Sequence, residues 1–249
     1  MYGSDWKAEL DFLQDCFDKY ADGQVGTVFE PACGTGRLLF RLAGLGFDVG
    51  GLDLNPAMVD YCNARLEKHG RPGRVTLGDM TDFRVQRPYE AAFNLINSFR
   101  HLTTEKAAID HLRCVARALH PGGLYVLGLH LTPLDIEPLQ EESWPARRGN
   151  LAVLSRLWIV SADYQRRYEE VGMSYDVYTP TKQFRIEGRS RFRTYTAAQF
   201  EKTLKSAGVF EVVATHDFGY DAGEDIEIQG ETEDIVYVLR ATGQRPGRL

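Results

Sequence analysis

Three short segments of the chain combine glycine with acidic residues. The first is Glu30-Pro-Ala-Cys-Gly-Thr-Gly36, the second ends on Asp53, and the third is Gly78-Asp79-Met80. Glycines let a backbone turn sharply and approach a bound molecule closely. We therefore expect the segment from Glu30 to Gly36 to form a tight turn against a ligand.

The residues after this turn discriminate between classes of nucleotide site. A dinucleotide fingerprint, G-x-G-x-x-G, needs a third glycine, but the chain has the bulky Leu39 there. The phosphate-binding loop pattern also fails, because no Gly-Lys-Ser/Thr follows. An adenosine ligand without a pyrophosphate needs only the tight turn, so it stays compatible with the sequence.

Alternating strands and helices must position these residues. The expected strands are Val25–Phe29, Phe47–Leu54, Arg74–Leu77, Ala91–Ile96 and Leu124–Leu129. The expected helices are Asp5–Tyr20, Arg37–Ala43, Pro56–Lys68 and Thr104–Leu119, with His120 to Gly123 as a turn. This alternation predicts an α/β domain with a parallel sheet, in which ligands bind beyond the carboxyl ends of the strands.

The pattern changes after His130. Residues 131–150 are expected to form a long ordered loop, the kind that often acts as a lid. An antiparallel insert should follow, with strands Leu151–Ile159, Tyr164–Tyr178 and Lys182–Thr194 and turns at 161–163 and 179–181. A helix, Thr196–Ala207, and strands Val209–Ala214 and Asp234–Leu239 complete the pattern. We thus expect a core of residues 1–130 and 195–241, a lid and substrate or dimer insert at 131–194, and a disordered tail at 242–249.

Composition narrows the class of partner. The net charge of -6 and the pI near 5.6 argue against a nucleic-acid partner. No stretch approaches about 20 apolar residues, and the first residues lack a secretory signal pattern, so no membrane is expected. The 4 cysteines are scattered, which argues against a metal site and favours a reduced, cytoplasmic setting.

In order, these features resemble the class I S-adenosylmethionine-dependent methyltransferases. Glu30-x-x-Cys-Gly-Thr-Gly36 is similar to motif I of that family, and the segment 119–123, Leu-His-Pro-Gly-Gly, resembles its turn into the fifth strand. The resemblance covers residues 25–129 and more weakly 195–208 and 234–241. It implies a Rossmann-like, mostly parallel sheet flanked by helices, with an antiparallel β insert after the fifth strand, and S-adenosylmethionine as cofactor.

The resemblance also implies roles for single residues. Asp53 would bind both ribose hydroxyls, and Asp79 with the Met80 backbone would read adenine; a carboxylate can accept both hydroxyl donors. Glu30 would meet the methionine ammonium, and the backbone of Gly34 and Gly36 the carboxylate near a helix N-terminus. The remaining expected cofactor contacts are Ala32, Arg37, Leu54 and Asn97. In the alternative reading, Glu30 is a polar loop residue and Asp53 caps a helix, although Asn55 is itself a fair cap.

Histidines supply the candidate groups for proton transfer. His101 and His130 lie just past the carboxyl ends of predicted strands, and His216 is a weaker candidate. The alternative for each is a surface or hydrogen-bonded loop histidine, which the sequence favours over a catalytic role, most of all for His216. The resemblance implies a small-molecule methyl acceptor with an amine or hydroxyl group, and the insert would cover it or form a homodimer surface.

Three other functions compete with this one. A methyltransferase acting on RNA or protein is disfavoured by the acidic balance, and Asn97-Ser-Phe-Arg100 stands where nucleic-acid amino methyltransferases have an N-P-P-Y signature. A catalytically silent scaffold with the same fold is disfavoured by the intact motif I. A nucleotide-dependent oxidoreductase is disfavoured by Leu39.

Overall fold

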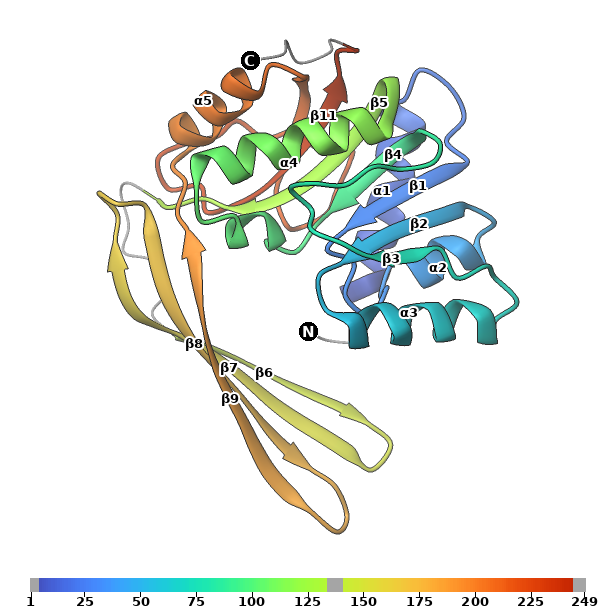
Figure 1. The fold of residues 1–249 in the computed structure, drawn as a ribbon. Helices are drawn as coiled ribbons and strands as arrows, with labels where there is room; N and C mark the ends of the chain where they lie inside the picture. The colour runs from blue at the N-terminus through green and yellow to red at the C-terminus, as the bar shows by residue number, and fades with distance from the viewer. Residues whose placement is uncertain (1–4, 134–140, 244–249) are drawn as a thin grey trace.

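A mostly parallel sheet forms the centre of the fold (Figure 1). The computed structural model describes residues 5–133 and 141–243. Within these residues the sheet has seven strands in the order β10-β11-β5-β4-β1-β2-β3, and β11 runs antiparallel to both of its neighbours. The strands are β1 (Thr27–Pro31), β2 (Asp48–Asp53), β3 (Val75–Leu77), β4 (Tyr89–Asn94), β5 (Leu119–His130), β10 (Phe210–His216) and β11 (Asp234–Ala241).

Helices cover both faces of this sheet, so the protein has two cores. One face packs on α1, α2 and α3, and the other on α4 and α5. Successive strand residues alternate between the cores: Val28 belongs to the first and Phe29 to the second. The helices are α1 (Asp5–Tyr20), α2 (Leu39–Gly44), α3 (Pro56–Lys68), α4 (Glu105–Ala118), α5 (Ala197–Ala207) and the short 3-10 helix η1 (Ser98–His101).

The strand order reverses direction at β1. This strand pairs in parallel with β2 on one side and with β4 on the other. The connections after β1 and after β4 therefore diverge beyond the carboxyl ends of these strands. Open α/β sheets bind their ligands at such a point.

A second sheet, which we call the arm, follows β5. It is antiparallel, in the order β6-β7-β8-β9, and it extends away from the core (Figure 1). The backbone N–H of Thr132 donates to the carbonyl of Tyr195 at 2.6 Å, so the chain leaves the core and returns to it at neighbouring positions. The strands are β6 (Glu141–Arg148), β7 (Leu151–Asp163), β8 (Tyr168–Tyr178) and β9 (Gln183–Arg193).

The prediction of a long loop at 131–150 is wrong for the second half of this range. Residues Glu141–Arg148 form β6, which pairs antiparallel with β7. Pro145 is tolerated in β6 because this is an edge strand, and edge strands accommodate proline. Residues 134–140, and with them part of the expected lid, lie outside the described residues, as does 244–249 of the expected disordered tail.

Two expected turns differ from the structure. Strand β7 continues through 161–163, and the chain reverses at 164–167 instead. Asp163 begins that turn, because its Oδ1 accepts from the Arg166 N–H at 2.9 Å. The segment from His120 to Gly123 is a bulge inside β5, since β4 pairs with β5 at Leu119 and resumes only at Leu124. Helix α2 begins two residues later than expected, a shift within the usual uncertainty of helix ends.

Candidate active site

The glycine-rich turn leaves β1 in a left-handed backbone conformation. The φ angles of Ala32, Gly34 and Gly36 are 54°, 53° and 66°. A Cβ atom on Gly36 would stand 2.2 Å from the Cys62 sulfur of α3, so only glycine fits there. The Cys33 N–H donates to the Leu52 carbonyl at 3.0 Å, which ties the turn to the end of β2.

Asp53 binds the turn directly. Its Oδ2 accepts from the Gly34 N–H at 2.8 Å, and its Oδ1 accepts from the Asn55 N–H at 2.8 Å. Asn55 caps α3 through the Ala57 N–H at 3.0 Å, as expected. Each carboxylate oxygen of Asp53 keeps a further lone pair for a ligand hydroxyl. The next side chain, Leu54, is 73% exposed and offers an apolar surface beside it.

Asp79 and Met80 follow β3 in a tightly held loop. The Asp79 Oδ1 accepts from both the N–H and the hydroxyl of Thr81, each at 2.8 Å. The Met80 carbonyl is held by His111 Nδ1 at 3.0 Å, and His111 Nε2 lies 2.8 Å from the Tyr125 hydroxyl. Burial lowers the pKa of His111 to about 4, so this histidine is neutral and donates to Met80 from Nδ1.

Glu30, at the end of β1, holds an unsatisfied oxygen. Its Oε2 is shielded from solvent and has no hydrogen-bond partner among the described residues. Desolvation raises the pKa of Glu30 well above its ordinary value, and the Arg37 guanidinium opposes this shift. A buried acceptor without a donor in the protein needs a partner from outside it, such as a ligand or an ordered water. The ammonium group of a bound amino acid moiety would supply the missing donor.

Arg37, which sequence predicts as a cofactor contact, has a protein partner. It forms an ion pair with Glu9 of α1, whose side chain is almost fully buried. Helix α1 is thereby attached to the turn that follows β1. Sequence did not single out Glu9, because one acid on an amphipathic helix carries no distinguishing signal.

Asn97 joins the tips of β4 and β5. Its backbone is left-handed, with φ of 55°, and its Oδ1 accepts from the His130 N–H at 3.1 Å. The His130 Nδ1 contacts the Asp234 carboxylate of β11, and its ring packs edge-on against Phe218 at 5.1 Å. A carboxylate on Nδ1 favours the tautomer whose Nε2 can accept a proton.

His101 lies at the end of η1, where it contacts the arm. Its ring meets the Phe192 ring edge-on at 4.7 Å. Desolvation and the neighbouring Arg100 guanidinium lower the pKa of His101. His216, the weaker candidate, is fully buried against α1, 3.2 Å from the Tyr20 hydroxyl and 2.8 Å from the Glu224 carbonyl. It is therefore a hydrogen-bonded core histidine.

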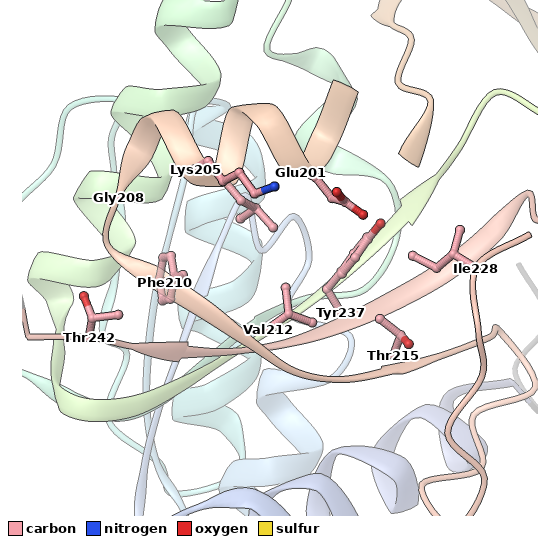
Figure 2. A pocket seen from close by; sticks show the side chains of 10 residues that line it. Glu201, Lys205, Gly208, Phe210, Val212, Thr215, Ile228, Tyr237 and Thr242 are labelled. Atoms are coloured by element: carbon pink, nitrogen blue, oxygen red, sulfur yellow. The ribbon is translucent and has the colours of Figure 1, made fainter. Parts of the chain in front are cut away.

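A separate cavity of about 470 Å³ lies between α5 and strands β10 and β11 (Figure 2). Its walls include Leu204, Phe210 and Tyr237, and none of the predicted cofactor or catalytic residues lines it. Strands β11, β5 and β4 separate β10 from β1, so this cavity lies away from the point where the strand order reverses. Among the described residues, no cluster of histidine, cysteine and acidic side chains could hold a metal ion. No described helix has the length and apolar character needed to cross a membrane.

Comparisons with known proteins show what the chain is similar to. The family model of a methyltransferase domain matches residues 28–123. The chain is 23% identical to Bacillus subtilis YqeM over 213 residues, which are 85% of this chain and 83% of that protein. It is 28% identical over 125 residues to a Streptomyces venezuelae dTDP-3-amino-3,4,6-trideoxy-alpha-D-glucopyranose N,N-dimethyltransferase, covering 50% of this chain and 51% of that enzyme.

A solved S-adenosylmethionine-dependent methyltransferase from Clostridium acetobutylicum has the same fold. The TM-score is 0.78 at 18% identity, covering 97% of this chain and 94% of that one. The chain therefore has the fold of S-adenosylmethionine-dependent methyltransferases, and its first half resembles a methyltransferase domain. Residues 28–123 carry the methyltransferase domain itself.

Proposed function

We propose that this enzyme transfers a methyl group from S-adenosylmethionine to the amine of an amino sugar. The observation that carries the proposal is the cradle beyond β1 and β2, where Asp53 binds the glycine turn and Glu30 presents an unpaired buried oxygen. The relative from Streptomyces venezuelae is named for dimethylation of an amino sugar, which supports an amine over a hydroxyl acceptor.

The cofactor contacts are part of this proposal. Asp53 would accept the ribose hydroxyls, and Glu30 the methionine ammonium. Asp79 and the Met80 backbone would bind adenine beside the exposed Leu54. The further contacts would come from Ala32, Gly34, Gly36, Arg37 and Asn97.

The bound cofactor supplies a methyl group on a positively charged sulfur, which is an activated leaving group. The protein's residues then have to exclude water and orient the acceptor nitrogen, which can lower a barrier by roughly 7–11 kcal/mol. An ammonium acceptor must lose a proton before its nitrogen has a free electron pair. His130 can accept that proton at Nε2, because Asp234 contacts Nδ1. His101 is a second candidate, at the arm side of the site.

A ligand titration tests the cofactor site. Ligands that bind only the folded state stabilise it by about 2.7 kcal/mol at 100 times their Kd. S-adenosylhomocysteine should therefore raise the melting temperature of the wild type and of the control Asp60→Ala, an exposed acid on α3. Asp53→Ala should lose most of this shift. No shift at millimolar ligand in the wild type would contradict the cofactor assignment.

Mass spectrometry tests the acceptor. Incubation with S-adenosylmethionine and dTDP-3-amino-3,4,6-trideoxy-α-D-glucose should add one or two methyl groups to the sugar. Turnover of RNA or protein instead would show a macromolecular methyltransferase. Cofactor binding without turnover of any amine or hydroxyl would show a scaffold.

The proposal extends to the arm and to the setting of the enzyme. The core would bind the cofactor, and the arm would cover the acceptor and join two copies in a homodimer. Phe184 and Ile186 of β9 are 47% and 53% exposed and share one face, where they pair with Val177 and Tyr175 of β8. The acidic net charge of -6 supports a small-molecule acceptor over nucleic acid. Cysteines that are free thiols support the cytoplasm.

A further inference from the structure

One cross-strand pair of the arm contacts η1, the 3-10 helix that ends at His101. Glu169 of β8 and Phe192 of β9 are directly opposite each other in the antiparallel pairing, so their side chains project from the same face. Glu169 contacts Arg100, and Phe192 contacts His101. This cross-strand pair therefore contacts two successive residues of η1, Arg100 and His101.

The contact between Arg100 and Glu169 is a buried ion pair. The two residues are 8% and 7% exposed. The Arg100 Nε also donates to the Arg193 carbonyl of β9 at 2.9 Å. A buried guanidinium and carboxylate lose their hydration, so they have to keep this geometry to remain satisfied. The pair thus fixes η1 to the arm.

The Phe192 ring contacts both the His101 ring and the Arg100 guanidinium. The His101 ring meets it at 4.7 Å with an interplanar angle of 80°. The Arg100 guanidinium lies 5.3 Å from the centre of the same ring. Both arrangements suit the negative face of an aromatic ring.

The start of η1 is held from the core. Asn97, which precedes it, accepts from the His130 N–H at the tip of β5. Helix η1 is therefore held by the core at Asn97 and by the arm at Arg100 and His101. A displacement of the arm would move His101 relative to His130.

We propose that Glu169 and Phe192 are positioning residues of the acceptor site. Through Arg100 and the His101 ring, they set the place of His101 beside the acceptor. The arm then takes part in acceptor recognition and is more than a dimer surface or a cover. This inference rests on the proposed function for its kinetic consequence, whereas the position of His101 can be measured without turnover.

Nuclear magnetic resonance of ¹³C-labelled histidine measures that position. The His101 Cε1–H signal is assigned by its loss in His101→Gln. Phe192→Leu should move this signal, because it removes the ring-current shift of the phenyl group. Glu169→Gln should move it in the same direction, as η1 leaves the Phe192 ring. The matched control is Glu170→Gln, the neighbouring acid, which pairs with exposed Arg189 at 3.4 Å. In Glu170→Gln the His101 signal should keep the chemical shift of the wild type.

Kinetics with dTDP-3-amino-3,4,6-trideoxy-α-D-glucose give a second readout. Glu169→Gln should raise the KM for this acceptor about tenfold, because small displacements of positioning groups have large effects. The Kd for S-adenosylhomocysteine should stay within about twofold of the wild type, since the cofactor cradle is untouched. A purely structural role would instead lower the amount of folded enzyme and leave KM unchanged.

The two experiments separate two kinds of failure. An unmoved His101 signal in Glu169→Gln overturns the positioning role, whatever the acceptor is. A moved signal in an enzyme that does not methylate the probe supports the positioning role and counts against the amino-sugar acceptor. If Glu169→Gln does not fold, Glu169→Asp replaces it, because it keeps the charge and withdraws the carboxylate from Arg100.

Discussion

At the scale of single residues, Glu30 combines its proposed role in cofactor binding with a cost to stability. Its carboxylate is desolvated, and its pKa is raised well above the ordinary value. Between the ordinary pKa and the raised one, the folded state holds the proton that the unfolded state has lost. Stability therefore falls as the pH rises through this interval, and it stays reduced above it.

Replacing Glu30 by glutamine should remove this penalty. We expect Glu30→Gln to melt at a higher temperature than the wild type at pH 8 without cofactor, and the difference should shrink towards pH 4. The same variant should bind S-adenosylhomocysteine more weakly, because the amide is neutral. Thermal melts across pH, with exposed Glu67→Gln of α3 as control, measure the effect. A Glu30→Gln protein that is less stable at pH 8 would contradict the desolvation argument.

The stability that His111 contributes should fall as the pH falls, which is opposite to the pH dependence expected for Glu30. Its folded pKa is about 4, below its ordinary value of 6.5, so its stabilisation is complete above pH 6.5 and is lost as the pH falls towards 4. His111→Leu leaves the Met80 carbonyl and the Tyr125 hydroxyl without partners, which costs about 1–3 kcal/mol for each buried group. Urea denaturation at pH 7.5 and 5 should show a smaller loss of stability at pH 5. Equal losses at both pH values would exclude a neutral His111.

Single residues differ in how far sequence could place them. Gly36, Asp53 and Asp79 follow successive strands, and parallel strands end at one edge of the sheet, so their proximity could be inferred. Glu9 and Glu169 had no such signal. Their partners are distant in sequence, and only the packing of α1 and of the arm brings those charges together.

At the scale of elements, the turn between β1 and α2 depends on Gly36. Gly36→Ala places a Cβ against Cys62 and forces a left-handed alanine, which should cost about 2–4 kcal/mol. It should also abolish S-adenosylhomocysteine binding. Cys62→Ala in the same chain should recover part of the stability, because the sulfur contact disappears and the backbone strain remains.

Gly44, at the end of α2, is the matched control for this test. A Cβ there meets no atom within 4 Å. Gly44→Ala should leave ligand binding intact and stability unchanged or higher by up to about 1 kcal/mol, as alanine favours helix. Urea denaturation and calorimetric titration measure both quantities. Equal effects at the two glycines would show that the turn geometry is not the cause.

Elements with strong periodic patterns could be predicted, whereas irregular ones could not. The central strands and the longer helices, such as α1 and α3, form near their expected ranges because their apolar spacing matches the element. β6 could not be predicted, because Pro145 is unfavourable in most strands and the sequence does not show that this strand lies at a sheet edge. The bulge in β5 was expected as a turn, since the Pro121-Gly122 pair has the same local chemistry in both.

At the scale of the whole molecule, the arm exposes the apolar side chains of Phe184 and Ile186, which carry the proposed homodimer contact. Phe184→Glu combined with Ile186→Glu places charges on that face and should convert a dimer to a monomer. Sedimentation equilibrium of both proteins measures the mass. The control is Val212→Glu on β10, an exposed apolar residue that lies on the core sheet, outside the arm. A wild type that is already monomeric at 100 µM would exclude the homodimer.

The hydrogen bond between Thr132 and Tyr195 has an evolutionary consequence. Because the arm departs and rejoins at adjacent points, an exchange of this stretch between related genes would leave the central sheet intact. Laboratory recombination can use the same junctions, grafting foreign hairpins between them to change which acceptor such a protein takes.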